Sequence, residues 1–143
     1  MSAARCVALL RGINVGKAKR VAMADLRAVV ESLGGRDVRT LLNSGNVVFA
    51  TSKPEGFAAR LAKAIASKCG VTARVTVISA DDLELVVREC PLADVATDPS
   101  RLLVAFLADV ADRPRLVALA KESWKPEAMA VGNFWAIESQ GCN

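Results

Sequence analysis

The residues best suited to chemistry lie between an apolar strand and the first predicted helix. Residues 12–20 contain two glycines, one asparagine and three cations, and Arg11 directly precedes them. Cations and a backbone that permits close approach, placed at the end of a strand, are typical of sites for a phosphate or carboxylate. The free N–H groups of a helix that begins near Met23 add partial positive charge nearby. The sequence therefore predicts an anion-binding loop at this point.

A second polar loop, residues 43–46, follows the next strand along the chain. It reads Asn-Ser-Gly-Asn and supplies uncharged hydrogen-bonding groups. In a split βαβ unit the first two strands are parallel, so their carboxyl ends emerge at one end of the sheet. We therefore expect the two loops to meet and form one ligand site. The predicted ligand-binding residues are Arg11, Gly12, Asn14, Gly16, Lys17, Lys19, Arg20, Asn43, Ser44, Gly45 and Asn46.

The same residues also have a purely structural interpretation. Asn-Ser-Gly-Asn makes a tight turn without any ligand, and glycines between a strand and a helix often serve geometry alone. Cations in a loop are usually solvated. Three functions therefore stay open: binding of a phosphorylated small molecule or nucleic acid, an enzyme that acts on a phosphorylated metabolite with Lys17 as electrophile, and an assembly module whose loops only close the fold.

Several other kinds of chemistry are disfavoured by residue type or spacing. The chain has no histidine and no tyrosine, which excludes Ser-His-Asp and Cys-His catalysis within it and the common zinc sites. Gly12 and Gly16 are one residue too close for a P-loop, and Ala18 stands where that loop needs a hydroxyl. The acidic residues within residues 81–84 lie in the first turn of a capped helix. The helix dipole stabilises acidic side chains there, so no metal is needed to explain them. We therefore expect no metal and no cofactor.

The composition indicates an ordinary globular chain. Of its 143 residues, 52% are hydrophobic and 24% are charged, which suits a core without disulfide staples. The four cysteines form no C-x-x-C pair, and we expect Cys6, Cys69 and Cys90 to be buried small apolar residues. No apolar run is long enough to span a membrane, and the start of the chain lacks a signal peptide. We therefore expect a cytoplasmic protein with no membrane partner.

Positive charge is concentrated in the first third of the chain. Residues 1–50 hold eight cations and three acids, whereas residues 51–143 hold eleven cations and twelve acids. Such an excess indicates an anionic partner, and the candidates are a phosphate-bearing ligand and nucleic acid. Stacking of bases on the sheet face has little support, because the first and third predicted strands offer only Phe49 as an aromatic residue.

The pattern of apolar residues predicts the order βαββαβ over residues 1–80, which is typical of a ferredoxin-like, or split βαβ, unit. The expected strands are residues 5–11, 38–42, 47–50 and 71–78. Ser52 and Glu55 have the spacing of a capping box at the start of the second helix. Residues 81–100 are expected to form a connecting helix, capped by Ser79, and a linker. Residues 101–143 then repeat the pattern as βαββ.

We therefore predict an α+β fold of tandem ferredoxin-like halves, the second lacking its last helix and strand. In a complete unit the fourth strand lies beside the first, so its absence leaves one edge of the strand from Arg101 to Ala108 unpaired. That strand is too apolar to be a stable free edge. We expect another strand to cover it, either from the first half or from a second copy in a homodimer.

Three motifs in the first fifty residues resemble a known family. Residues 9–17 read Leu-Leu-Arg-Gly-Ile-Asn-Val-Gly-Lys, residues 23–26 read Met-Ala-Asp-Leu, and residues 38–49 end in Asn-Ser-Gly-Asn-Val-Val-Phe. Together they closely resemble the bacterial family called domain of unknown function 1697. The resemblance implies an α+β fold with ferredoxin-like halves and no established activity. Two departures are Ala22, where the family often has proline, and a basic C-terminal segment of the family that this chain lacks.

Overall fold

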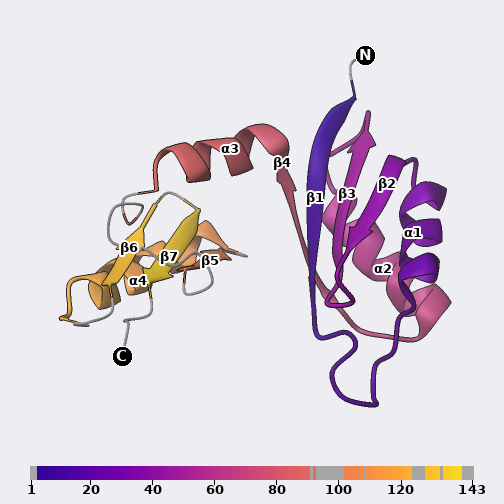
Figure 1. Ribbon diagram of the computed structural model, residues 1–143, viewed down its shortest axis with the longest axis horizontal. Coiled ribbons are helices and arrows are strands. Elements are labelled where there is room, and N and C mark those ends of the chain that lie inside the picture. The colour runs from indigo at the N-terminus through magenta and orange to yellow at the C-terminus, as the bar shows by residue number, and fades with distance from the viewer. Residues whose placement is uncertain are drawn as a thin grey trace. The chain divides into compact units, whose positions relative to one another are not determined.

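The computed structural model describes residues 3–90, 92, 102–107, 109–123, 128–132 and 134–139. The chain divides into two units, Met1–Leu83 and Glu84–Asn143, which we call unit 1 and unit 2. The described residues form four α-helices, a four-stranded antiparallel sheet and a three-stranded antiparallel sheet (Figure 1). The predicted α+β class is therefore confirmed. Within the same residues, no helix is long and apolar enough to cross a membrane.

Unit 1 has the element order βαββαβ. Its elements are β1 (Ala4–Arg11), α1 (Met23–Ser32), β2 (Arg36–Leu41), β3 (Asn46–Thr51), α2 (Phe57–Cys69) and β4 (Arg74–Ser79). The strands lie in the order β2-β3-β1-β4, and every neighbouring pair is antiparallel. Because β3 is antiparallel to both β1 and β2, these two strands run in the same direction. Their carboxyl ends and the start of β4 therefore lie at one end of the sheet (Figure 1).

The core of unit 1 lies between one face of this sheet and the two helices. Burial alternates along β1, which places Cys6, Ala8 and Leu10 in the core. The fully buried side chains of the helices are Leu26, Val30, Phe57, Leu61 and Ile65. Burying a side chain of this size stabilises the fold by roughly 1.5–3 kcal/mol. Cys6 is buried in the core, as predicted, and burial raises the pKa of its thiol, which makes it a poor nucleophile. Cys69 and Cys90, also predicted to be buried, are only partly buried.

The capping box predicted at Ser52 and Glu55 is wrong. Helix α2 begins at Phe57, and its N-cap is Gly56 in the left-handed conformation, with no side-chain cap hydrogen bond. The Phe57 ring is completely buried and stacks on Phe49, with ring centroids 4.6 Å apart. Burying and stacking an aromatic ring is worth more than the roughly 1 kcal/mol of a helix cap, so the core sets the start of this helix.

Unit 2 contains the smaller sheet. Its elements are β5 (Leu102–Phe106), the short 3-10 helix η2 (Val110–Asp112), α4 (Arg113–Ala120), β6 (Ala128–Val131) and β7 (Trp135–Ser139). The strands lie in the order β5-β7-β6, all antiparallel. Helix α3 (Ala80–Arg88) spans the boundary between the units and is capped as predicted, because the Ser79 hydroxyl accepts the Asp82 N–H at 3.1 Å. Arg101 and Ala108, the predicted ends of β5, and residues 93–100 of the linker lie outside the described residues.

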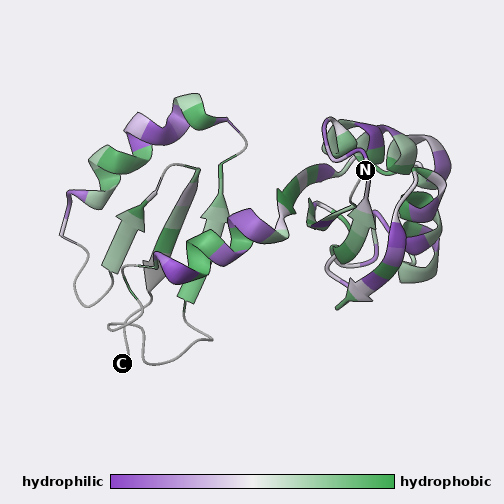
Figure 2. Ribbon diagram, turned by 90° about the horizontal axis from the view of Figure 1, so that it is seen from above, coloured by the Kyte–Doolittle hydropathy of each residue, from purple (hydrophilic) through white to green (hydrophobic). Residues whose placement is uncertain are grey.

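The core of unit 2 is centred on Trp135 of β7. Val86, Leu92 and Ile137 are buried with it, and Figure 2 shows the strands of this sheet mostly in the green of hydrophobic residues. The indole ring lies against Gly132: a Cβ added to that glycine would lie 2.1 Å from Trp135 Cε2. The Gly132 N–H also donates to the Trp135 carbonyl at 2.8 Å. Glycine is therefore required here for close approach of the ring.

Replacing Gly132 tests this contact. We expect Gly132→Ala to lower the free energy of unfolding by about 1–3 kcal/mol, because the new methyl group displaces the Trp135 ring. Urea unfolding measures the change. In a Trp135→Leu background the same substitution should cost much less, because no ring overlaps the methyl group. An equal cost in both backgrounds would contradict the contact.

Candidate functional site

Three segments of unit 1 meet at the end of the sheet where β1 finishes, and we call them the rim. They are residues 11–22, residues 42–45 and residues 70–74, which include the last residue of β1 and the first residue of β4. The N–H of Leu10 donates to the carbonyl of Gly45 at 3.0 Å, which joins β1 to the second segment. A Cβ on Gly12 would lie 3.9 Å from the Thr72 carbonyl oxygen in the third. The prediction that the cationic loop and the asparagine turn lie together is confirmed.

The side-chain amide of Asn14 ties two of these segments to each other. Its Nδ2 donates to the Asn43 carbonyl at 2.7 Å and to the Val21 carbonyl at 3.0 Å, and its Oδ1 accepts from the Val21 N–H at 2.8 Å. Both donor hydrogens are therefore used within the protein. The backbone of Asn14 has a φ of 53°, in the left-handed region that asparagine tolerates better than most residues. Asn14 therefore holds the loop closed.

Residues 14–19 form a short hairpin, which we call the arm. The N–H of Asn14 donates to the carbonyl of Lys19 at 2.8 Å. Nearer the tip, Val15 and Ala18 form an isolated β-bridge, and the Ala18 N–H donates to the Val15 carbonyl at 3.3 Å. The arm is therefore an ordered hairpin rather than an irregular loop.

The tip of the arm is open and cationic. Gly16 begins the turn with a φ of 60°, as glycine does at the first position of a type II′ turn. A Cβ at Gly16 would meet nothing within 4 Å, and Val15 is 65% exposed. Lys17 completes the turn, and it is exposed together with Lys19 and Arg20. Lys17 and Lys19 therefore face water on the arm, and Arg20 faces water directly after it.

Two arginines oppose each other beside the arm. Arg11 at the end of β1 lies directly opposite Arg74 at the start of β4, and both are exposed. Like charges directly opposite in antiparallel strands are destabilising. No described carboxylate forms a salt bridge with either arginine. Sequence reasoning missed Arg74, because only the register of β1 and β4 brings it to Arg11.

The rim therefore gathers five exposed cations without a salt bridge to any residue the structure describes. They are Arg11, Lys17, Lys19, Arg20 and Arg74. The surrounding unit has the same sign of charge: unit 1 holds thirteen cations and six acids, whereas unit 2 holds six cations and nine acids. The net charges of the two units, +7 and −3, therefore differ more than those of residues 1–50 and 51–143, which are +5 and −1.

The asparagine turn mainly serves its own geometry. Gly45 is buried with a φ of 99°, and a Cβ there would lie 2.7 Å from Ile13 Cδ1. The Asn46 amide nitrogen donates to the Ser44 hydroxyl at 3.2 Å and to a backbone carbonyl at 3.3 Å. Ser44 and Asn43 are exposed, so these two residues are the ones whose side chains can reach a ligand from this turn.

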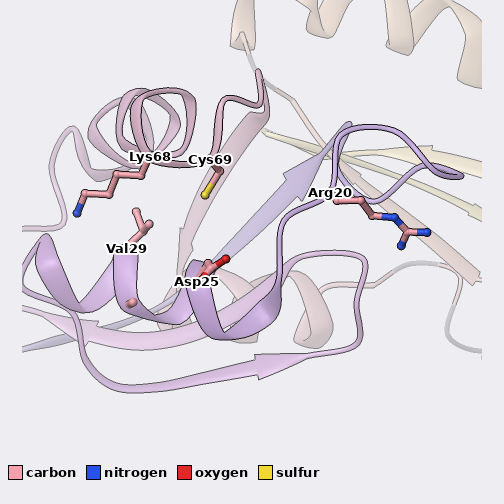
Figure 3. Close-up of a pocket in the computed structure, with 6 residues that line it drawn as sticks. Arg20, Asp25, Val29, Lys68 and Cys69 are labelled. Atoms are coloured by element: carbon pink, nitrogen blue, oxygen red, sulfur yellow. The ribbon is translucent and has the colours of Figure 1, made fainter.

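An open hollow of about 450 Å³ lies beside the rim, between the end of the cationic loop and the two helices (Figure 3). It is lined by Arg20, Asp25, Ala28, Val29, Lys68 and Cys69. Figure 3 shows the Arg20 and Lys68 side chains pointing in opposite directions, and Lys68 Nζ donates to the Ser32 hydroxyl at 3.0 Å. Because its charged groups do not converge, this hollow is a weaker candidate than the exposed rim.

Within unit 1, the sheet face opposite the helices carries no aromatic side chain for stacking. Phe49 and Phe57, the two aromatic residues of unit 1, are 1% and 0% exposed in the core. A hollow of about 600 Å³ on this face is lined by Arg5, Asp37, Arg39, Leu41 and Val48. The burial of Phe49 removes the one residue that could have stacked on a base there.

Comparison with known proteins identifies the family. Residues 3–135 match the family described as "Protein of unknown function (DUF1697)", so the chain belongs to that family, as its three motifs indicated. None of the curated proteins matches the chain. Among solved structures, it is similar to conserved bacterial protein SP0830 from Streptococcus pneumoniae, with a TM-score of 0.79 and 24% identity. The similarity covers 99% of this chain and 79% of that chain, and at this identity it shows the fold alone.

Replacing Asn14 tests its role in holding the rim together. We expect Asn14→Ala to lower the free energy of unfolding by about 2 kcal/mol, because hydrogen bonds are lost and alanine is strained at positive φ. Asn14→Gly removes only the bonds and should cost less. Amide hydrogen exchange at Val21 should accelerate in both variants. Unchanged protection of the Val21 N–H would show that the Asn14 amide does not fix the loop.

Proposed function

We propose that this protein binds a phosphate-bearing ligand at the rim of unit 1. The observation that carries the proposal is the pair of Arg11 and Arg74, opposed in register and without a salt bridge to any described carboxylate. A bound anion would replace their repulsion with charge-assisted hydrogen bonds. Lys17 and Lys19 on the arm, and Arg20 directly after it, extend the same positive surface.

The charge and polarity of the surrounding residues support this proposal. Unit 1 has a net charge of +7, from thirteen cations and six acids, which raises the local concentration of anions of every size. Of the polar residues predicted to orient a ligand, Asn43 and Ser44 are exposed at the rim. Asn14 and Asn46 use their amide donors to shape the loops, and their part in binding is indirect.

We also infer that unit 1 is a ferredoxin-like unit and that unit 2 is an incomplete one. The order βαββαβ with strands arranged β2-β3-β1-β4 supports the first assignment. In unit 2, β7 lies between β5 and β6, as the third strand of such a unit lies between the first two. The cytoplasmic location stays a prediction from the sequence.

Catalysis at the same loops has less support than binding. An electrophilic lysine acts best in a site that excludes water, where its charge is poorly screened. Lys17 is exposed at the tip of the arm, and neither of the two hollows described above is lined by it. The geometry therefore favours a surface that holds phosphate groups without turning them over.

The arginine pair makes this proposal testable. We expect Arg11→Gln/Arg74→Gln to raise the free energy of unfolding without ligand by up to about 1 kcal/mol, because the repulsion is removed. The same variant should bind sodium tripolyphosphate at least about tenfold more weakly, because charge-assisted hydrogen bonds are lost. Urea unfolding and titration calorimetry at low salt measure the two effects.

Arg5→Gln/Arg36→Gln is the matched control, because it also removes two exposed arginines, near the starts of β1 and β2 at the other end of the sheet. It should change neither quantity appreciably. If the double variant is less stable than the natural protein and binds tripolyphosphate equally well, the arginines are structural and the proposal fails.

A second candidate function is assembly through β5, which a separate observation favours. β5 is at an edge of its sheet, its five residues are all apolar, and Leu103 is 55% exposed. An edge strand without charge, proline or bulge favours pairing with another strand. The partner we propose is β5 of a second copy, antiparallel about a twofold axis, which joins two sheets into one.

Sedimentation equilibrium tests this assembly. The natural chain should be a dimer, and Leu103→Lys should give a monomer, because a lysine on the edge opposes pairing. Val110→Lys is the control, because Val110 is a similarly exposed apolar residue outside the sheet, 58% against 55%. A natural chain that stays monomeric throughout the concentration series would reject pairing through β5.

A further inference from the structure

We infer that the ligand of the rim is B-form duplex DNA, whose major groove receives the arm while Arg11 and Arg74 contact phosphates beside it. This inference rests on the proposed function and names the ligand class of the same site. It is drawn from the shape of the arm, the burial of the aromatic rings of unit 1, and the cations of the rim.

The shape of the arm suits a groove. It is a short hairpin, two chain segments wide, closed by hydrogen bonds from Asn14 to Lys19 and from Ala18 to Val15. The major groove of B-form DNA, about 12 Å wide, admits a two-stranded β-ribbon. The Asn14 amide fixes the base of the arm to the rest of the rim, so little conformational freedom remains to be lost on binding. Gly16 at the tip allows the backbone to approach the DNA closely.

The buried aromatic rings argue against a single-stranded ligand. Proteins hold single strands largely by stacking bases on exposed aromatic side chains, in this sheet architecture as in others. Phe49 and Phe57 stack on each other in the core and cannot do this. The affinity of the rim must therefore come from contacts with phosphate groups. Duplex DNA presents one negative charge per about 1.7 Å of its axis, a higher charge density than that of a single strand.

The same geometry distinguishes DNA from double-stranded RNA. The major groove of an A-form helix is deep and narrow, so side chains cannot read it and a ribbon has no room to enter. Contacts to phosphates carry little sequence information, so DNA of mixed sequence is a suitable probe. The rim should therefore prefer B-form DNA with little dependence on its sequence.

Fluorescence anisotropy with the full chain tests the inference. The probes are a mixed-sequence DNA duplex of two helical turns, an RNA duplex of the same sequence, and an oligo-dT single strand of equal length. We expect the DNA duplex to bind at least about tenfold more tightly than the other two at low salt, because only it combines groove entry with dense charge. For five contacted phosphates, the slope of log K against log salt should be about −4.5.

Variants then locate the contact on the protein. Lys17→Ala/Lys19→Ala/Arg20→Ala should reduce the magnitude of that slope by about 2.7, because three phosphate contacts are lost. The matched control removes the same number of exposed lysines and arginines away from the rim, at Lys53, Lys63 and Arg36. The control should leave the slope unchanged. Equal effects of the two triple variants would overturn the inference.

A charge-preserving variant tests the shape of the arm. Gly16→Val keeps every cation but places a β-branched residue at a φ of 60°, which strains the turn. Affinity for duplex DNA should fall severalfold while the salt slope is retained. Undiminished affinity would overturn entry of the ribbon into the groove.

The probes separate this inference from the proposed function. Tighter binding of the single strand or of the RNA duplex would overturn the inference. Anion binding at the rim would still be upheld if Lys17→Ala/Lys19→Ala/Arg20→Ala weakened the binding of that ligand. If no nucleic acid binds but tripolyphosphate does, the inference alone fails. If tripolyphosphate also fails to bind, both fail.

Discussion

The rim depends on the side-chain amide of Asn14. One amide group joins the arm to Val21 and to Asn43, so it sets both the shape of the arm and its position beside the neighbouring turn. The hydrogen bonds it makes offset the unfavourable left-handed backbone at this residue. They also oppose the mutual repulsion of the nearby cations, which would otherwise favour an extended and mobile loop. The positive surface is therefore ordered before any ligand arrives.

The core of unit 1 makes an unfavourable charge arrangement tolerable. One face of β1 buries Cys6, Ala8 and Leu10, and this packing fixes the register that sets Arg11 against Arg74. Repulsion within the arginine pair costs up to about 1 kcal/mol, whereas burial of a single large core side chain contributes more than that. Two like charges directly opposite each other, retained at the end of a well-packed strand, are the pattern expected of a functional site.

The order of helices and strands in unit 1 could be predicted from the sequence, because it follows from the periodicity of apolar residues. The meeting of the two loops could also be predicted, because it follows from the order of the strands. The sequence does not contain the place of Arg74, which depends on the register of two strands far apart in the chain. Nor does it distinguish an asparagine that binds a ligand from one that closes a loop, since Asn14 has the same polarity in either role. The capping box at Ser52 failed because burial of Phe57 outweighs a cap.

The central claim, that phosphate groups bind at the rim, is tested most directly by locating the ligand on the protein. Backbone amide chemical shifts, followed by NMR while tripolyphosphate is added to the full chain, report each residue separately. The account predicts that the largest saturable changes fall at Arg11, at Lys17 and its neighbours in the arm, and at Arg74. Saturable changes confined to unit 2 or to the outer face of α2, with the rim unaffected, would contradict it.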